Sequence, residues 1–143
     1  MLFGKPKRIV KRILIVEDEP LTAFDNETML EEAGYEVVAI HDRFADAIVT
    51  MEREQVDLIL SDVRLAGERT GIDIALEAKK LGIPVLFSTG QAPEAASEMV
   101  MGCLLKPYTN RTLKAALQAV DQHLAGDTAD LVRGLTLYPA VDS

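Results

Sequence analysis

Residues 58–65 have the sequence LILSDVRL, in which a short apolar run ends at a serine and at the carboxylate of Asp62. Such a run without polar alternation is typical of a strand that helices cover on both faces. With Asp57 included, 57–60 is the third of five runs of this kind; the others are at 12–16, 35–40, 83–87 and 103–105. The five runs predict a doubly wound α/β domain with a five-stranded parallel sheet in the order 2-1-3-4-5.

The segments between the runs predict the helices of such a domain. The first helix is expected to begin at Pro20 and to stop at Gly34, because proline suits a first helical turn and glycine a helix end. Apolar residues at helical spacing predict further helices over 44–51 and 113–124, and another that ends near residue 82. The fourth helix, over about 93–100, is short and is therefore expected to be reduced.

Three regions of the chain are expected. Residues 1–10 form a basic leader and residues 11–124 form the α/β domain. Residues 125–143 show no convincing period and are therefore expected to be a tail or docking segment. Length and composition agree with one domain, since 143 residues with 48% hydrophobic content can bury a core.

Charge and cysteine content exclude several functions. A net charge of −8 disfavours nucleic-acid binding, and the absence of tryptophan argues against a base-stacking surface. The only cysteine, Cys103, excludes an internal disulfide and a cysteine-based zinc site. No apolar run is long enough for a membrane span or a signal-peptide core, so we expect a cytoplasmic protein.

Reactive side chains follow four of the five expected strands. Glu17 and Asp18 follow the first, Asp62 the third, Thr89 the fourth and Lys106 the fifth. Taken singly, each is more often a helix cap or a surface residue, but the carboxyl ends of parallel strands meet at one edge of the sheet. Three close carboxylates need a cation, for which Mg²⁺ is suited. The set predicts a phosphoryl site with Asp62 as the nucleophile.

The motifs ILIVEDE, LILSDVRL, PVLFSTG and LLKPY together resemble the receiver domain of two-component response regulators, over about residues 11–124. The resemblance implies a flavodoxin-like fold and phosphorylation of Asp62 by a histidine kinase or phosphotransfer protein. It implies that Asp18, Asp62 and the backbone carbonyl of Arg64 bind Mg²⁺. Glu17 would act largely through water.

The same resemblance gives roles to the residues after the fourth and fifth strands. Thr89 would move toward the phosphoryl group, and Lys106 would pair with it. The peptide bond between Lys106 and Pro107 is usually cis in this family.

Two departures from the common receiver pattern concern the segment between Thr89 and Lys106. Cys103 stands where most receivers have tyrosine or phenylalanine, and we interpret it as a small buried hydrophobe rather than a redox residue. The interval is also about one helical turn short. These two features, with the sequence Phe87-Ser88-Thr89-Gly90, resemble the FATGUY subgroup, whose members are often stand-alone receivers in alphaproteobacterial signalling, including the general stress response. Gln91 and Ala92 depart from that motif.

Two residues, Arg64 and Gln91, are expected to tune the lifetime of the phosphorylated state. Arg64 lies two residues after Asp62 and could pair with Glu17 or Glu19, or shield the acyl phosphate from water. Gln91 lies two residues after Thr89. Gly90 leaves open space beside Thr89. Phosphorylation is expected to shift a segment between two conformations, and residues 89–102 are the candidate for this segment.

The expected function is a phosphoacceptor that signals by contact with a downstream protein, and other functions compete with it. An aspartate-nucleophile phosphohydrolase needs a second acid two residues after the first, and Arg64 occupies that place. A dedicated enzyme is therefore not expected, only slow self-dephosphorylation. A phosphate sink and a docking module that works without phosphorylation remain as alternatives.

Overall fold

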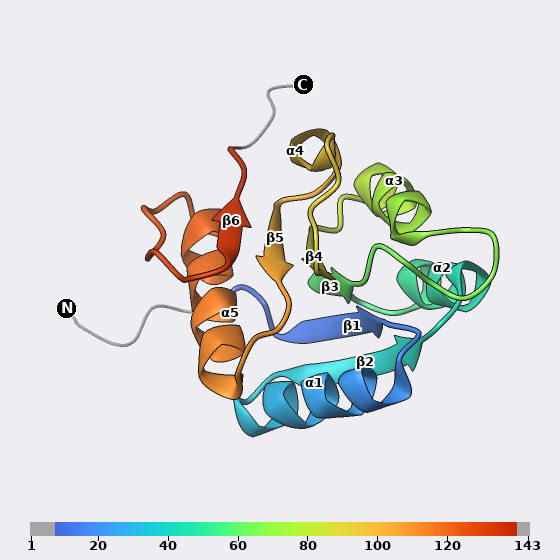
Figure 1. The fold of residues 1–143 in the computed structure, drawn as a ribbon, viewed down its shortest axis with the longest axis horizontal. Helices are drawn as coiled ribbons and strands as arrows, with labels where there is room; N and C mark the ends of the chain where they lie inside the picture. The colour runs from blue at the N-terminus through green and yellow to red at the C-terminus, as the bar shows by residue number, and fades with distance from the viewer. Residues whose placement is uncertain (1–7, 140–143) are drawn as a thin grey trace.

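Each apolar run of the sequence forms a strand of one sheet in the computed structural model, which describes residues 8–139 (Figure 1). The strands are β1 (Arg12–Val16), β2 (Glu36–His41), β3 (Leu58–Ser61), β4 (Val85–Thr89), β5 (Gly102–Leu105) and β6 (Leu135–Leu137). They lie in the order β2-β1-β3-β4-β5-β6. The first five are parallel, so the predicted doubly wound fold and its strand order are confirmed.

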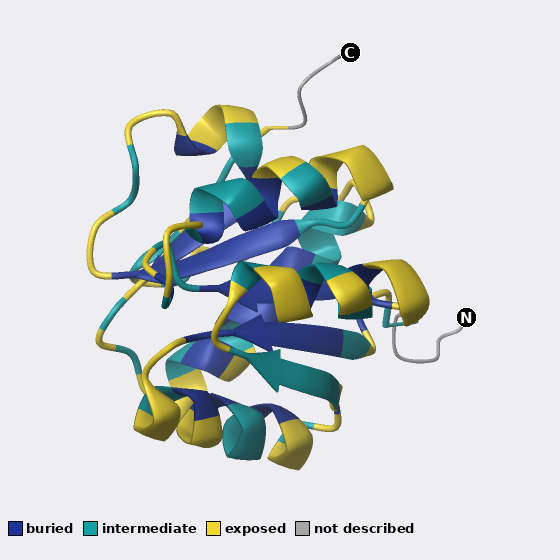
Figure 2. Ribbon diagram, turned by 90° about the vertical axis from the view of Figure 1, so that its right-hand side faces the viewer, coloured by how far each residue is buried: buried dark blue, intermediate teal, exposed yellow. Residues whose placement is uncertain are grey.

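Helices cover both faces of this sheet. They are α1 (Pro20–Glu32), α2 (Phe44–Arg53), α3 (Gly71–Leu81), α4 (Ala96–Met99) and α5 (Asn110–Leu124). Residues of α1 and α5 pack into one apolar cluster, and residues of α2, α3 and α4 pack into another. The central strands are buried while each helix exposes one side (Figure 2). As expected, α4 is reduced, to four residues.

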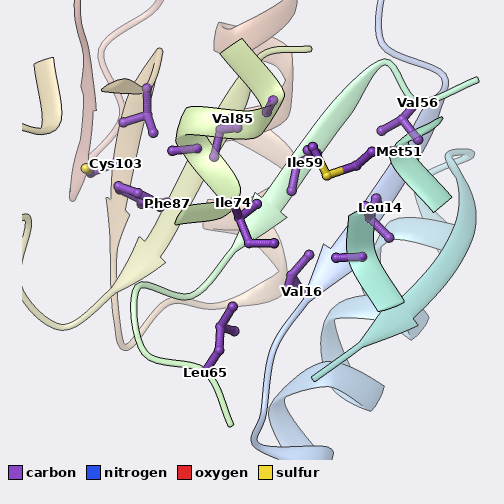
Figure 3. Packing of buried hydrophobic residues seen from close by; sticks show 14 of the residues in the cluster. Leu14, Val16, Met51, Val56, Ile59, Leu65, Ile74, Val85, Phe87 and Cys103 are labelled. Atoms are coloured by element: carbon purple, nitrogen blue, oxygen red, sulfur yellow. The ribbon is translucent and has the colours of Figure 1, made fainter. Parts of the chain in front are cut away.

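Successive residues of a strand belong to opposite clusters, which explains why the runs show no polar alternation. In β1, Leu14 faces the cluster under α2 and α3, whereas Ile15 faces the cluster under α1 and α5. Phe87 of β4 and Cys103 of β5 lie side by side in the cluster under α2 and α3 (Figure 3). Both sheet faces are therefore core, as the sequence predicted.

The structure adds a sixth strand to the five that were expected: residues 135–137, within the segment expected to be a tail or docking segment, form β6. β6 pairs antiparallel with β5, with Cys103 opposite Thr136. Three residues are too few to show a period, so pairing with a distant edge decides this strand. Leu135 and Leu137 also pack against the α1–α5 cluster.

The expected leader falls mostly on residues 1–7, which lie outside the described residues. Its last part is not free, because the amides of Ile9 and Val10 donate to the Asp121 carboxylate of α5 at 3.0 and 2.8 Å. Residues 140–143 also lie outside the described part. Over residues 8–139, the helices are too short or too polar to cross a membrane.

Candidate functional site

Three carboxylates meet at the carboxyl ends of β1 and β3. Glu17 and Asp18 follow β1, and Asp62 follows β3. The amide of Asp62 donates to the carbonyl of Val16 at 2.9 Å, which places the ends of the two strands side by side. One oxygen from each carboxylate lies within 4.8 Å of the others. The structure thus brings together the three acids that the sequence assigned to one site.

Lys106 reaches this acidic group from the end of β5. Its ammonium lies 2.8 Å from Oε1 of Glu17 and 3.2 Å from Oδ2 of Asp62. Its backbone amide donates to the carbonyl of Thr89 at 2.8 Å. The following peptide bond, to Pro107, is cis, as the family resemblance implied. The lysine therefore bridges the ends of β1 and β3 by its side chain and is fixed to β4 by its backbone.

Thr89 is buried at the end of β4, and its hydroxyl is bonded to the backbone of Gln91 rather than to Asp62 or Lys106. The hydroxyl donates to the carbonyl of Gln91 at 3.0 Å and accepts from the amide of Gln91 at 3.2 Å. A Cβ at Gly90 would meet no atom within 4 Å, so the space beside Thr89 is open, as expected. Rotation of Thr89 would free its hydroxyl for another acceptor.

Arg64 lies on the turn after Asp62, at the rim of the site. Its amide donates to Oδ1 of Asp62 at 3.1 Å, but its side chain is exposed. Within residues 8–139 it makes no ion pair shorter than 4.0 Å, so the suggested pairing with Glu17 or Glu19 is not present. Arg64 instead lines a cleft of about 630 Å³ together with Asp62, Thr89, Gln91 and Lys106.

Burial and charge act in opposite directions on Glu17 and Lys106. Burial raises the pKa of Glu17, and the hydrogen bond from Lys106 only partly offsets it. Burial lowers the pKa of Lys106, but its bonds and attraction to Glu17 and Asp62 outweigh burial and raise that pKa overall. Lys106 is therefore cationic at neutral pH.

The donor set fits Mg²⁺. An octahedral Mg²⁺ holds oxygens at about 2.1 Å, which places them about 3 to 4.2 Å from one another. One carboxylate oxygen from each of Glu17, Asp18 and Asp62 lies within 4.8 Å of the others, which is close to that spacing. Both oxygens of Glu17 are engaged, by Lys106 and by the amide of Glu19, which agrees with an indirect role through water.

Comparison with known proteins identifies this arrangement. The sequence model of the response regulator receiver domain matches residues 13–118. The chain belongs to the receiver-domain family. Receivers are signalling phosphoacceptors, so the family agrees with the chemistry of the acidic cluster, and the predicted resemblance is confirmed.

Three relatives illustrate the match. The phyllosphere-induced regulator PhyR of Methylorubrum extorquens is 35% identical over 115 residues, covering 73% of this chain and 41% of that protein. The solution structure of SdrG from Sphingomonas melonis Fr1 has a TM-score of 0.63 at 30% identity, covering 73% of this chain and 91% of that one. A sensor-kinase receiver domain from Pseudomonas aeruginosa PAO1 has a TM-score of 0.66 at 29% identity, covering 76% and 95%.

Two facts about these relatives bear on function. The structure of the Pseudomonas receiver domain has a magnesium ion coordinated in its active-site cleft. The chain spans about half the length of the curated relatives that it matches.

Two parts of this receiver were not predicted from the sequence. Cys103 is buried, as expected, but its sulfur accepts a hydrogen bond from the hydroxyl of Tyr138 at 3.5 Å. On the other sheet face, the hydroxyl of Tyr108 lies 2.6 Å from that of Ser88 and 3.2 Å from the amide nitrogen of Asn26. Tyr108 belongs to the LLKPY motif, so its position could have been noticed, whereas Tyr138 lies beyond the motifs.

Proposed function

We propose that this chain is a cytoplasmic single-domain response regulator whose Asp62 accepts a phosphoryl group in a Mg²⁺-dependent reaction. The donor is a histidine kinase or a phosphotransfer protein, and the output is contact with a downstream protein. The observation that carries the proposal is the position of Lys106, 3.2 Å from Asp62 and 2.8 Å from Glu17. A fixed cation beside the acceptor carboxylate is suited to pair with a phosphoryl oxygen once that carboxylate is phosphorylated.

The transfer is an in-line displacement at phosphorus. An Asp62 oxygen attacks the phosphoryl group of the donor phosphohistidine, the P–N bond breaks, and the imidazole leaves with that electron pair. Asp18, Asp62 and the Arg64 carbonyl would hold Mg²⁺, which would neutralise charge at the phosphoryl oxygens. Lys106 then exchanges its bond to Asp62 for one to a phosphoryl oxygen. Thr89 gives up its bond to Gln91 and donates to another.

The local chain favours a phosphoacceptor over a hydrolase. A hydrolase would place a general acid/base two residues after the nucleophile, and that position is Arg64, whose side chain is exposed. The aspartyl phosphate is therefore expected to decay slowly. If the chain were instead a phosphate sink, it would exchange phosphoryl groups quickly with a kinase and form no stable downstream complex.

The assignment to the stand-alone FATGUY-type receivers rests on likeness to that subgroup at the end of β4 and in the segment after it. Phe87 is fully buried, Thr89 is followed by the open Gly90, and α4 is only four residues long. A short α4 leaves the 89–102 segment with few constraints, which suits a two-state element.

Phosphotransfer tests the proposal directly. A panel of autophosphorylated histidine kinases, labelled on phosphohistidine, is mixed with the wild type, with Asp62→Ala and with Asp127→Ala, an exposed aspartate outside the site. Label is expected on the wild type and on Asp127→Ala, with Mg²⁺ and not with chelator, and none on Asp62→Ala. Labelling of Asp62→Ala at the wild-type rate would contradict the assignment.

A further inference from the structure

Strand β6 runs along the outer edge of β5 and holds it at both ends (Figure 1). At the end near the site, the amide of Leu105 donates to the carbonyl of Gly134 at 2.8 Å. At the other end, the amide of Tyr138 donates to the carbonyl of Met101, also at 2.8 Å. β5 is therefore held between β4 on one side and β6 on the other.

The sequence of β5 matches the docked β6. A Cβ on Gly102 would lie 2.5 Å from the Thr136 carbonyl oxygen and 2.9 Å from a methyl carbon of Leu137. The three atoms nearest to that position all belong to β6, so a side chain at Gly102 would collide with this strand. The next residue, Cys103, is small and accepts the hydrogen bond from the Tyr138 hydroxyl. Two successive residues of β5 are thus fitted to β6.

The same strand carries Lys106 into the phosphoryl site. The amide of Leu105 is bound by Gly134 of the β6 segment, and the amide of Lys106 is bound by Thr89 of β4. These two consecutive bonds fix the end of β5 from opposite sides. The ammonium of Lys106 then lies 3.2 Å from Asp62. Gly134 is therefore connected to the acceptor carboxylate in three steps: its hydrogen bond to Leu105, the peptide bond from Leu105 to Lys106, and the ion pair of Lys106 with Asp62.

The β6 contact is also one that can open. β6 has three residues, and neither Leu135 nor Leu137 is fully buried, while Thr136 is exposed. Short edge strands with exposed hydrogen bonds lie at the low-stability end of a protein. Tyr138 packs at the margin of the cluster that also receives Ala92 and Met99, from the segment after Thr89. A movement of that segment and a movement of β6 would affect the same cluster.

We infer that β6 positions Lys106 for the phosphoryl group, with the Gly134 carbonyl and Tyr138 as the positioning groups, and that phosphorylation in turn tightens β6 on β5. The inference rests on the proposed function of Asp62 and adds a regulatory element to it. If docked β6 favours the Lys106 position that binds phosphoryl oxygens, occupancy of the site must favour docked β6 by the same factor. β6 therefore reports whether Asp62 is phosphorylated. Cys103 could not do this alone, because it replaces the aromatic residue of common receivers.

The wild-type protein provides the first test. Hydrogen exchange of the Leu105 and Tyr138 amides is measured with and without beryllofluoride plus Mg²⁺, a mimic of the aspartyl phosphate. We expect both amides to exchange at least about fivefold more slowly when beryllofluoride is bound. The amide of Glu36, which donates to Lys11 far from β6, serves as the internal reference. Binding itself is followed by the shifts of Val63 and Arg64.

Gly102→Ala provides the second test, because its methyl group would collide with Thr136 and Leu137 of β6. Cys103, the only cysteine of the chain, is a built-in probe: its labelling by a thiol reagent should accelerate when Tyr138 leaves. We expect faster labelling and an affinity for beryllofluoride at least about fivefold lower. Thr136→Ala keeps β6 docked and should match the wild type. Val56→Ala removes buried methyl groups outside the site, which controls for general destabilisation.

The outcomes separate this inference from the proposed function. If Gly102→Ala labels quickly but binds beryllofluoride as the wild type does, β6 does not position Lys106. If Gly102→Ala does not fold, unchanged exchange of Leu105 and Tyr138 in the beryllofluoride-bound wild type overturns the inference equally. If beryllofluoride causes no shifts at Val63 and Arg64, the phosphoacceptor function itself fails, and the inference falls with it.

Discussion

At the residue scale, Glu17 and Lys106 depend on one another. Glu17 is 4% exposed, and ionising so buried a carboxyl is unfavourable unless a cation is close. Lys106 supplies that cation, but it also faces Asp62. A phosphoryl group that draws Lys106 away from Asp62 can therefore be accommodated without breaking the pair with Glu17. The site holds its lysine in advance of the reaction.

Arg64 is predicted to protect the aspartyl phosphate from water. Its side chain is exposed and lines the cleft with Asp62, and no ion pair within the described residues holds it elsewhere. Arg64→Ala should therefore lose label a few-fold faster after phosphorylation, measured as decay of the purified phosphoprotein. Arg53→Ala, at the far end of α2, is the matched control. Equal decay rates for Arg64→Ala and wild type would show that the side chain has no such role.

At the element scale, α3 is placed against the site by its first residues. Gly71 lies against the backbone of Asp62 and Val63, where a Cβ would collide with the Asp62 carbonyl. The helix start is fixed by a capping box: the Thr70 hydroxyl accepts from the Ile72 amide, and the Thr70 amide donates to Asp73 at 2.7 Å. The loop after Asp62 is thus anchored by one helix terminus.

This capping box predicts a pH-dependent contribution to stability. The bond from the Thr70 amide is the main cause of a pKa of Asp73 below its usual 3.8. Because the folded pKa is the lower one, the stabilisation is present above pH 3.8 and is lost as pH falls through the folded pKa. Asp73→Asn should lower the free energy of unfolding by about 1 kcal/mol at neutral pH. In denaturant titrations the difference from wild type should shrink toward pH 3, whereas a constant difference would contradict the assignment.

The elements that the sequence predicted well are those bounded by strong local signals. The run at 57–60 and the helix from Pro20 were placed within a residue or two. β4 begins two residues later than expected and extends through Ser88 and Thr89, because both pair with β5. β6 was missed because its three residues are stabilised by pairing with β5, some thirty positions away, and by packing on the α1–α5 cluster. Tertiary pairing, not local propensity, decides such a strand.

The site was predictable for a related reason. Asp62, Thr89 and Lys106 each follow an apolar run, so the strand order alone brings them to one edge. The direction of the Thr89 hydroxyl was not predictable, because it depends on local hydrogen bonds to the backbone of Gln91. The contact between Cys103 and Tyr138 was equally hidden, since one partner lies outside every motif.

At the scale of the whole molecule, the acidic cluster opposes the stability of the fold that carries it. The chain has a net charge of −8, and three of its carboxylates are held within 4.8 Å at one sheet edge with one lysine between two of them. Such repulsion is a stored cost that a bound cation relieves. Mg²⁺ is therefore expected to stabilise the entire domain, since the strands that end in these acids are its central ones.

Thermal unfolding in Mg²⁺ and in chelator tests this expectation. At a Mg²⁺ concentration about 100 times the dissociation constant, the folded state should gain about 2.7 kcal/mol, which raises the Tm by several degrees. Asp18→Asn removes one ligand and leaves the Lys106 bridge intact, so its Tm should respond weakly to Mg²⁺. In chelator the same variant should melt no lower than wild type, because one of three repelling charges is gone. A Tm shift by Mg²⁺ that is equal in the two proteins would place the ion elsewhere.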